Sequence, residues 1–219
     1  MYAIFYLISE HLEGISMELF KNETIWYHGT TTQFETTISN IKVERKRRRQ
    51  KALDFGVGFY LTSNRTQAVA WAKRKASMFN KHEESKHVSV RPLVISYTID
   101  FNEIFQKEFS INYFGHYISE EFLDFLHLNR VELLNVIKEG RYNGNLHQYS
   151  LVYGSVADGV SGDIISALTS FKEHRDVELT KKGLAFRING VREDQLCICN
   201  QDVVQYIKEE GREYCEIEK

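Results

Sequence analysis

The sequence predicts an α+β protein, because strand-like and helix-like stretches are mixed without regular alternation. Short runs rich in β-branched and aromatic residues, at 24–30, 87–99, 149–158 and 195–199, are typical of strands. A longer amphipathic stretch at 119–140 is typical of a helix. The 219 residues are 42% hydrophobic, with one proline and no Gly/Ser-rich linker, so we expect a single domain over the whole chain, 1–219.

The first third of the chain predicts two helices around a strand. Apolar side chains recur at helical spacing over residues 2–20, which indicates a helix that packs on the core or binds a partner. A strand over 24–30 ends at a glycine turn, and residues 31–41 predict a short helix entered through a threonine cap. Residues 1–22 are therefore expected to be a helical extension.

The middle of the chain contains the sequence "GVGFYLT" at 56–62, which predicts a strand after a glycine-rich turn. Asn64, followed three residues later by Gln67, resembles a capping box that opens a helix over 65–79. A concentration of positive charge at 45–51 precedes the strand and is expected to be a loop.

The remaining elements follow from caps and periodicity. Ser119 and Gly140 are the expected start and end of the long helix. We expect further elements in this order: a helix over 162–174, a strand over 183–188, a strand over 195–199 and, after the cap residue Asn200, a last helix over 201–210.

Charge and cysteine content limit the possible functions. The net charge is −2, which excludes the overall basicity of a dedicated nucleic-acid binder. Cys197, Cys199 and Cys215 lack the partners of a zinc site, so no metal is expected. Cys197 and Cys199 are expected on one face of a strand, a poor geometry for bridging, which favours reduced thiols. No signal peptide or membrane-spanning run is recognised, so we expect a cytoplasmic protein without membrane contact.

Common catalytic signatures are missing from the sequence. It contains no GxSxG, GxxxxGK[ST], HExxH or GxGxxG motif. "DFG" at 54–56 is a kinase motif, but a kinase also needs a glycine-rich loop, a strand lysine and an HRD loop upstream, and none is present. Asp54 is therefore expected to fix the geometry of its loop.

One set of residues suggests a slot for a flat ring. Tyr60 lies on a strand, and Trp71 follows it by eleven residues on a helix that can fold back. Two aromatic faces can hold a ring between them by offset stacking, and an electron-poor pyridinium gains further. Gly29 and Gly58 would allow the backbone to approach such a ligand closely. His28 could donate a hydrogen bond to a ribose hydroxyl.

This ordered set resembles the diphtheria-toxin-like ADP-ribosyltransferases, which include the poly(ADP-ribose) polymerases. "YHGT", "DFGVGFYLT", "GSVAD" and "DQLCIC" follow one another as in a bacterial branch of that superfamily known only as a domain of unknown function. The resemblance covers residues 24–208. It implies an ADP-ribosyltransferase-like fold, with a split central β-sheet core flanked by helices, and NAD as substrate.

The resemblance also implies roles for individual residues. His28 would hold ribose hydroxyls, the backbone of Gly29 would bind the nicotinamide carboxamide, and Thr30 would lie beside the ribose. Tyr60 would be the stacking tyrosine and Trp71 the second aromatic.

Two positions depart from the family pattern. Ala68 stands where the polymerases use a serine for the carboxamide. Gln195 stands where a glutamate usually binds the ribose 2′-OH and stabilises the oxocarbenium-like transition state; glutamine brings no charge. Glu193 is expected on the same strand face and could supply that charge. Three interpretations follow: a transferase with a glutamine variant, an enzyme that uses Glu193, or an inactive binder of NAD or ADP-ribose.

The resemblance further implies an acceptor macromolecule, either protein or nucleic acid. Bacterial relatives suggest a toxin or defence effector with a neutralising antitoxin protein. The basic run 45–51 is either a solvated loop or a contact for the NAD diphosphate or an anionic acceptor. Asn129 and Arg130, an "NR" pair typical of this branch, are expected to serve helix packing or a salt bridge.

Overall fold

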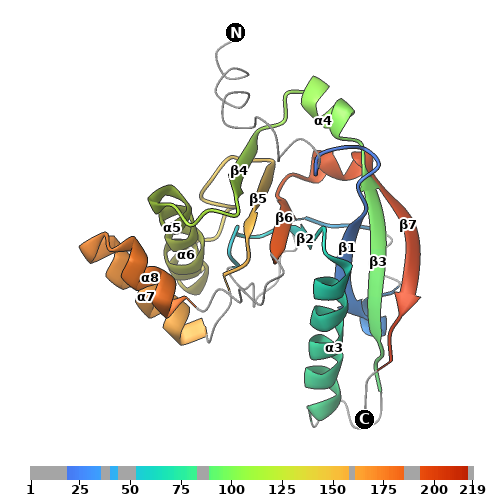
Figure 1. The fold of residues 1–219 in the computed structure, drawn as a ribbon, viewed down its shortest axis with the longest axis horizontal. Coiled ribbons are helices and arrows are strands. Elements are labelled where there is room, and N and C mark those ends of the chain that lie inside the picture. The colour runs from blue at the N-terminus through green and yellow to red at the C-terminus, as the bar shows by residue number, and fades with distance from the viewer. Residues whose placement is uncertain are drawn as a thin grey trace.

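The protein is described by a computed structural model in which helices and strands are mixed and the strands form two sheets (Figure 1). This arrangement confirms the mixed α and β class expected from the sequence. The N-terminal helix expected over 2–20 and the basic run 45–51 fall outside the described residues, except for a turn at 19–20. The structure describes residues 19–35, 40–43, 53–82, 89–157, 161–184 and 193–216.

The first sheet has three antiparallel strands in the order β1 (Trp26–Thr31), β3 (Pro92–Ile99) and β7 (Ile207–Tyr214). Helix α3 (Arg65–Lys81) lies along this sheet (Figure 1). Its small buried residues, Ala68, Ala72 and Ala76, allow the helix to approach the strands closely.

The second sheet has four strands in the order β2 (Phe59–Leu61), β6 (Asp194–Ile198), β5 (Leu151–Ser155) and β4 (Ile111–Gly115). The β4–β5 pair is parallel and the other pairs are antiparallel. All five residues of β6 are buried, which matches the apolar run that predicted this strand.

Helices at one side of the second sheet bury a second apolar cluster with it (Figure 1). The stretch predicted as one helix over 119–140 begins and ends as expected: Ser119 accepts a hydrogen bond from the Phe122 N–H at 3.1 Å, and Gly140 has a φ of +70°. Within it, a π-helical turn separates two α-helices. These elements are α5 (Glu120–His127), the turn Leu128–Glu132, α6 (Leu133–Lys138), α7 (Ser161–His174) and α8 (Val177–Gly183).

Only half of the predicted capping box of α3 forms. The Asn64 side chain accepts a hydrogen bond from the Gln67 N–H at 3.2 Å, as expected. The Gln67 side chain does not return to Asn64. Its amide instead donates to the carbonyl of Asp194 at 2.8 Å, which ties the helix start to the second sheet.

The helix predicted over 201–210 is wrong. A 3-10 helix, η4 (Gln201–Tyr206), leads directly into β7, which pairs with β3 at the edge of the first sheet. Charged residues dominate this edge strand, so it lacks the apolar alternation by which strands are recognised.

Other boundaries also differ from the predictions. The helix expected over 31–41 is a single 3-10 turn, η1 (Thr32–Phe34), and residues 36–39 lie outside the described part. Of the strand expected over 183–188, Gly183 ends α8, and residues 185–188 are not among those described. Helix α4 (Phe101–Gln106), like β4 and α8, was not predicted.

Candidate functional site

The site predicted from the sequence lies where the two sheets meet. Tyr27 of β1 and Thr62, directly after β2, form a β-bridge with two backbone hydrogen bonds of 2.8 and 3.0 Å. On its other side, β2 pairs with β6, so that Tyr60 lies opposite Cys197 and the next positions on the same faces, Thr62 and Gln195, also align. His28, Tyr60 and Gln195 therefore occupy three adjoining strands.

His28 reaches the backbone of Tyr60 rather than its side chain. The His28 Nδ1 lies 2.7 Å from the carbonyl oxygen of Tyr60, and the imidazole stacks on Phe59 with ring centroids 4.7 Å apart. Because a carbonyl only accepts, Nδ1 donates this hydrogen bond, which holds the ring in one orientation.

The Tyr60 side chain stabilises the turn that precedes its own strand. Its hydroxyl donates to the carbonyl of Gly56 at 2.8 Å and accepts from the Phe55 N–H at 3.0 Å. The ring is stacked with Phe55, the centroids being 6.4 Å apart. Burial, as the main cause, raises the pKa of Tyr60 well above 10. Tyr60 is therefore a neutral phenol at physiological pH.

Gln195 is oriented by hydrogen bonds from its amide nitrogen. Nε2 donates to Asp54 Oδ2 at 2.7 Å and to the carbonyl of Ser155 at 3.2 Å. Both donor positions of the amide are thus used, and no described residue donates to Oε1. The side chain therefore presents a hydrogen-bond acceptor in a fixed orientation.

Asp54 is a buried carboxylate that joins three segments. Its Oδ1 receives Arg130 Nε at 2.7 Å and the second guanidinium nitrogen at 2.6 Å, while Oδ2 receives Gln195 and the Ala157 N–H at 3.0 Å. Asp54 is 3% exposed. The expectation that Asp54 fixes a loop fits this arrangement, and the salt bridge expected for Arg130 is present.

The π-helical turn places Arg130 beside the site and buries Asn129. The Asn129 amide donates to the Phe125 carbonyl at 2.9 Å, and its buried Oδ1 has no hydrogen-bond partner among the described residues. A Cβ on Gly56, which has a φ of +83°, would lie 2.9 Å from that oxygen. Gly56 is thus required both by its backbone conformation and by the close contact with Asn129.

Trp71 and Tyr60 have different neighbours. Trp71 is 50% exposed on α3, with the Arg74 guanidinium 5.5 Å and the Lys75 ammonium 5.8 Å from its ring centroid. Within the described part of the chain, no ring contact joins Trp71 to Tyr60, whose hydroxyl is engaged at the turn. The two aromatics expected to face each other across a slot are therefore not in contact in this structure.

The two glycines expected to approach a ligand approach the chain itself. A Cβ on Gly29 would lie 2.2 Å from the carbonyl oxygen of Ala68 in α3. A Cβ on Gly58 would lie 2.3 Å from Cys197 Sγ in β6. Close packing of strand on helix and strand on strand accounts for both glycines. Thr30, the next residue in β1, is buried at 3% exposure.

Lys75 is a residue that the sequence did not single out. Its Nζ donates to the carbonyl of Gly29 at 2.7 Å, the backbone group that the resemblance assigns to the nicotinamide carboxamide. Burial lowers the pKa of Lys75 from 10.5 to about 8. The sequence could have indicated Lys75, because it follows Trp71 by four residues, a spacing that places both side chains on one side of α3.

Asp194, between Glu193 and Gln195, is the buried carboxylate of this strand. It accepts hydrogen bonds from the hydroxyls of Thr62 and Ser63, each at 2.5 Å, and from the Tyr153 hydroxyl at 3.0 Å. Glu193 is half-buried, and its carbonyl accepts from the Val156 N–H at 3.4 Å. Asp194 therefore belongs to the joint between the sheets.

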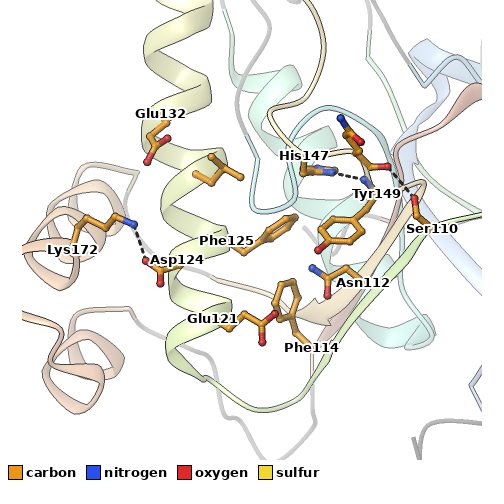
Figure 2. Close-up of a pocket in the computed structure, with 12 residues that line it drawn as sticks. Ser110, Asn112, Phe114, Glu121, Asp124, Phe125, Glu132, His147, Tyr149 and Lys172 are labelled. Atoms are coloured by element: carbon orange, nitrogen blue, oxygen red, sulfur yellow. Dashed lines mark hydrogen bonds and ion pairs between the residues drawn. The ribbon is translucent and has the colours of Figure 1, made fainter. Parts of the chain in front are cut away.

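A cavity of about 730 Å³ lies between β4, α5 and residues 147–149 (Figure 2). His147, on its wall, contacts the Phe55 carbonyl through Nε2 at 3.1 Å, so the cavity adjoins the turn on which Tyr60 is anchored. His28, Tyr60 and Gln195 do not line it. Its lining residues are Ser110, Asn112, Phe114, Glu121, Asp124, Phe125, Leu128, Glu132, His147, Gln148, Tyr149 and Lys172.

Comparison with protein families matches residues 24–208 to the family described as "Protein of unknown function (DUF3990)". The chain belongs to the DUF3990 family. The matched region of this DUF3990 chain contains the two-sheet joint, Asp54, Arg130 and all three strands that carry His28, Tyr60 and Gln195. No curated protein and no solved structure matches the chain.

Two further observations concern this DUF3990 chain as a whole. Within its described residues, no three His, Cys, Asp or Glu side chains gather closely enough to hold a metal ion. None of the helices in the same part of the chain is long and apolar enough to cross a membrane.

Proposed function

We propose that the protein is an NAD-dependent ADP-ribosyltransferase that cleaves the nicotinamide–ribose bond and transfers ADP-ribose to a protein or nucleic-acid acceptor. The observation that carries the proposal is the placement of His28, Tyr60 and Gln195 on three adjoining strands at the joint between two sheets. An ADP-ribosyltransferase-like fold, split into two sheets, is part of the same proposal.

His28 would bind NAD through a ribose hydroxyl. Its Nδ1 donates to the Tyr60 carbonyl at 2.7 Å, which fixes the orientation of the ring. A fixed ring orients the ribose without the entropy cost of ordering a free side chain. The backbone of Gly29 is the proposed carboxamide contact, and its carbonyl, which already accepts from Lys75, has a second lone pair for a carboxamide N–H.

Gln195 would bind the ribose 2′-OH through Oε1. Its amide nitrogen is already held by Asp54 and the Ser155 carbonyl, so the acceptor is preorganised. The charge that glutamine lacks is present one hydrogen bond away, on Asp54, but Arg130 compensates it. Stabilisation of an oxocarbenium-like state would therefore be mainly dipolar, and we expect slow cleavage.

Incubation with NAD labelled in the nicotinamide ring tests the proposal. Wild-type protein should release nicotinamide, and His28→Ala should slow release on the order of a hundredfold through loss of positioning. Gln195→Glu should slow release, because it sets a second carboxylate against Asp54 Oδ2 and removes the hydrogen bonds that orient the acceptor. Gln205→Glu makes the same chemical change at an exposed position of η4 and should leave the rate unchanged.

A second candidate is a non-catalytic module that binds NAD or ADP-ribose. The neutral amide of Gln195 favours it, because the charge that glutamine lacks is needed for cleavage and not for binding. Calorimetry separates the two candidates: binding of NAD that His28→Ala abolishes, with no nicotinamide release from wild type or Gln195→Glu, would establish the module and exclude the transferase. Absence of both binding and release would exclude both.

If the transferase activity is established, the next step is to identify the acceptor of ADP-ribose. Mass analysis of cellular protein and nucleic acid after expression should find added ADP-ribose on one of the two classes. A toxin or defence role, with a neutralising partner, would follow only from growth arrest on expression that His28→Ala relieves.

A further inference from the structure

Cys197 and Cys199 are brought together in a way that the sequence did not indicate. Their Sγ atoms lie 3.3 Å apart, although neither cysteine is in a disulfide. Cys197 is in β6 and Cys199 directly follows the last residue of that strand. The two side chains therefore share a face, and they approach each other within contact distance.

The surroundings distinguish the two thiols. Cys197 is fully buried beneath Gly58 and lies opposite Tyr60. Cys199 is half-buried, and its Sγ is 3.8 Å from the Phe55 carbonyl. Burial raises the pKa of Cys197 well above 9, whereas hydrogen bonding from Cys197 and from His147 lowers the pKa of Cys199 to about 6. Cys199 is thus the reactive thiol and Cys197 the protected one.

His147 lies beside both the cavity and Cys199. That imidazole lines the 730 Å³ cavity, and Figure 2 shows it on the cavity wall between Phe125 and Tyr149. His147 Nδ1 accepts the Tyr149 N–H at 3.2 Å, and Nε2 faces the Phe55 carbonyl at 3.1 Å, which orients the ring. Of the two thiols, Cys199 is the one that His147 contacts, so it is the thiol nearer the cavity.

We propose that Cys197 and Cys199 are a peroxide-oxidisable dithiol, in which Cys199 is the attacking thiol and Cys197 the resolving thiol. The Cys199 thiolate attacks one oxygen of hydrogen peroxide and becomes a sulfenic acid, and hydroxide leaves. The Cys197 sulfur then attacks the sulfenic sulfur, the S–O bond breaks, and the Cys197 proton leaves with the hydroxyl group as water. Overall, two thiols and one peroxide give one disulfide and two waters.

The backbone makes such a disulfide possible but strained. A strand rises by about 3.3–3.4 Å per residue, which puts two Cα atoms at positions i and i+2 near the upper limit of about 6.8 Å for a disulfide. Cys199 directly follows β6, and its N–H still donates to the Ser150 carbonyl at 2.8 Å, so the disulfide would form on a backbone that is held in place. Strain makes a disulfide easier to reduce, so the oxidation is reversible by a dithiol.

Peptide mapping after hydrogen peroxide treatment tests this proposal on the full chain. Trypsin should leave Cys197 and Cys199 together on peptide 193–208 and Cys215 on peptide 213–219. We expect peptide 193–208 to become two hydrogens lighter, to regain them with dithiothreitol, and to react faster in folded protein than in guanidinium-unfolded protein.

Variants identify the role of each thiol. Cys197→Ser should accumulate a sulfenic acid on Cys199 that dimedone traps, and Cys199→Ser should protect Cys197 from peroxide. Cys215→Ser is the matched control and should leave the linkage unchanged, because Cys215 lies apart, in contact with Glu213.

Three outcomes would overturn the proposal: no loss of hydrogen in peptide 193–208, oxidation of Cys199 to a sulfinic acid in wild type, or disulfides between two copies of the chain. Wild-type mapping alone decides among these, so the conclusion stands even where a serine variant does not fold. NAD plays no part in the readout, so the result is independent of the proposed transferase activity.

Discussion

Gln195 gains its orientation from residues that are far away in the chain. Asp54 lies 141 positions earlier and Ser155 40 positions earlier, and together they fix both amide hydrogens. A glutamine held in this way differs from a surface glutamine, because its acceptor oxygen needs no ordering when a hydroxyl arrives. The residue has the role of a positioned acceptor in either proposed function.

Lys75 predicts a specific dependence of stability on pH. Its pKa falls from 10.5 in the unfolded chain to about 8 in the folded protein, because the ammonium is buried. Between these values the unfolded state binds more protons than the folded state, so stability rises with pH. Wild type should gain about 2 kcal/mol of unfolding free energy relative to Lys75→Met between about pH 7.5 and pH 10.

Urea unfolding at the two pH values measures this difference, and other titrating groups cancel between the two proteins. Lys138→Met, at an exposed position of α6, is the control and should follow wild type at both pH values. Parallel behaviour of wild type and Lys75→Met would mean that the Lys75 amine is solvated.

For single residues, the sequence predicted the strand on which each site residue lies better than it predicted the residues that contact it. The strands of His28, Tyr60 and Gln195 are located correctly, because short-range patterns of apolar residues define strands. The contact of Lys75 with Gly29 was not predicted, nor was Asp54 as the partner of Arg130, since these two residues are 76 positions apart in the chain. Nothing in a local pattern specifies which distant charge a buried charge will meet.

The helical layer is tied to the glycine-rich turn by one buried ion pair. Arg130 lies in the π-helical turn between α5 and α6, and its side chain is 18% exposed, whereas that of Asp54 is 4% exposed. The π-helical turn interrupts the regular helical spacing between α5 and α6. It places the guanidinium of Arg130 beside Asp54, in the loop before β2. Helix and turn therefore hold their relative positions through this contact.

Asp54→Asn should destabilise the protein by about 3 kcal/mol, because it breaks a buried ion pair with Arg130. The double variant Asp54→Asn with Arg130→Gln should recover part of this loss, since it removes the cation that paired with Asp54. Urea unfolding measures all three proteins.

Glu139→Gln provides the comparison, because Glu139 pairs with Arg141 in an exposed position. Removal of an exposed pair should cost less than about 1 kcal/mol. A cost for Asp54→Asn no greater than that for Glu139→Gln would show that the buried pair does not tether the helices.

Elements with strong local signals were predicted, and those defined by tertiary pairing were not. Helix α3 has a cap and a long run of good helix formers, and α5 starts at a serine cap. By contrast, β7 is a strand because it pairs with β3. Its sequence is rich in Lys, Glu and Arg, a composition that is more typical of a helix. Tertiary context overrode local propensity there.

The two sheets are held together by a small polar joint. The Asp194 carboxylate accepts from two segments, Thr62–Ser63 and Tyr153, and Gln67 of α3 reaches the backbone of the same residue through both ends of its amide. The backbone bridge between Tyr27 and Thr62 completes the contact. The joint therefore links α3 and the first sheet to the second sheet.

Asp194→Asn should loosen this joint, because one amide nitrogen replaces an oxygen that accepts hydroxyls of Ser63 and Tyr153. A loss of about 2 kcal/mol in unfolding free energy is expected from the unsatisfied groups. Amide hydrogen exchange should quicken at the N–H groups of Tyr27 and Thr62, which report on both sheets.

Asp163→Asn, at an exposed position of α7, should leave exchange at these two amides unchanged. Faster exchange in the Asp194 variant that is confined to β5 and β6 would contradict a role in joining the sheets.

The order of strands in each sheet also determines when the molecule can be completed during synthesis. In the first sheet, β3 pairs with β7, and in the second sheet β2 pairs with β6. Each sheet therefore joins segments that are more than a hundred residues apart in the chain. Such non-local pairing is slow and begins only after the later segment has left the ribosome. A nascent chain that carries His28 and Tyr60 therefore lacks the third of these residues until β6 has left the ribosome, and any activity that depends on all three begins only then.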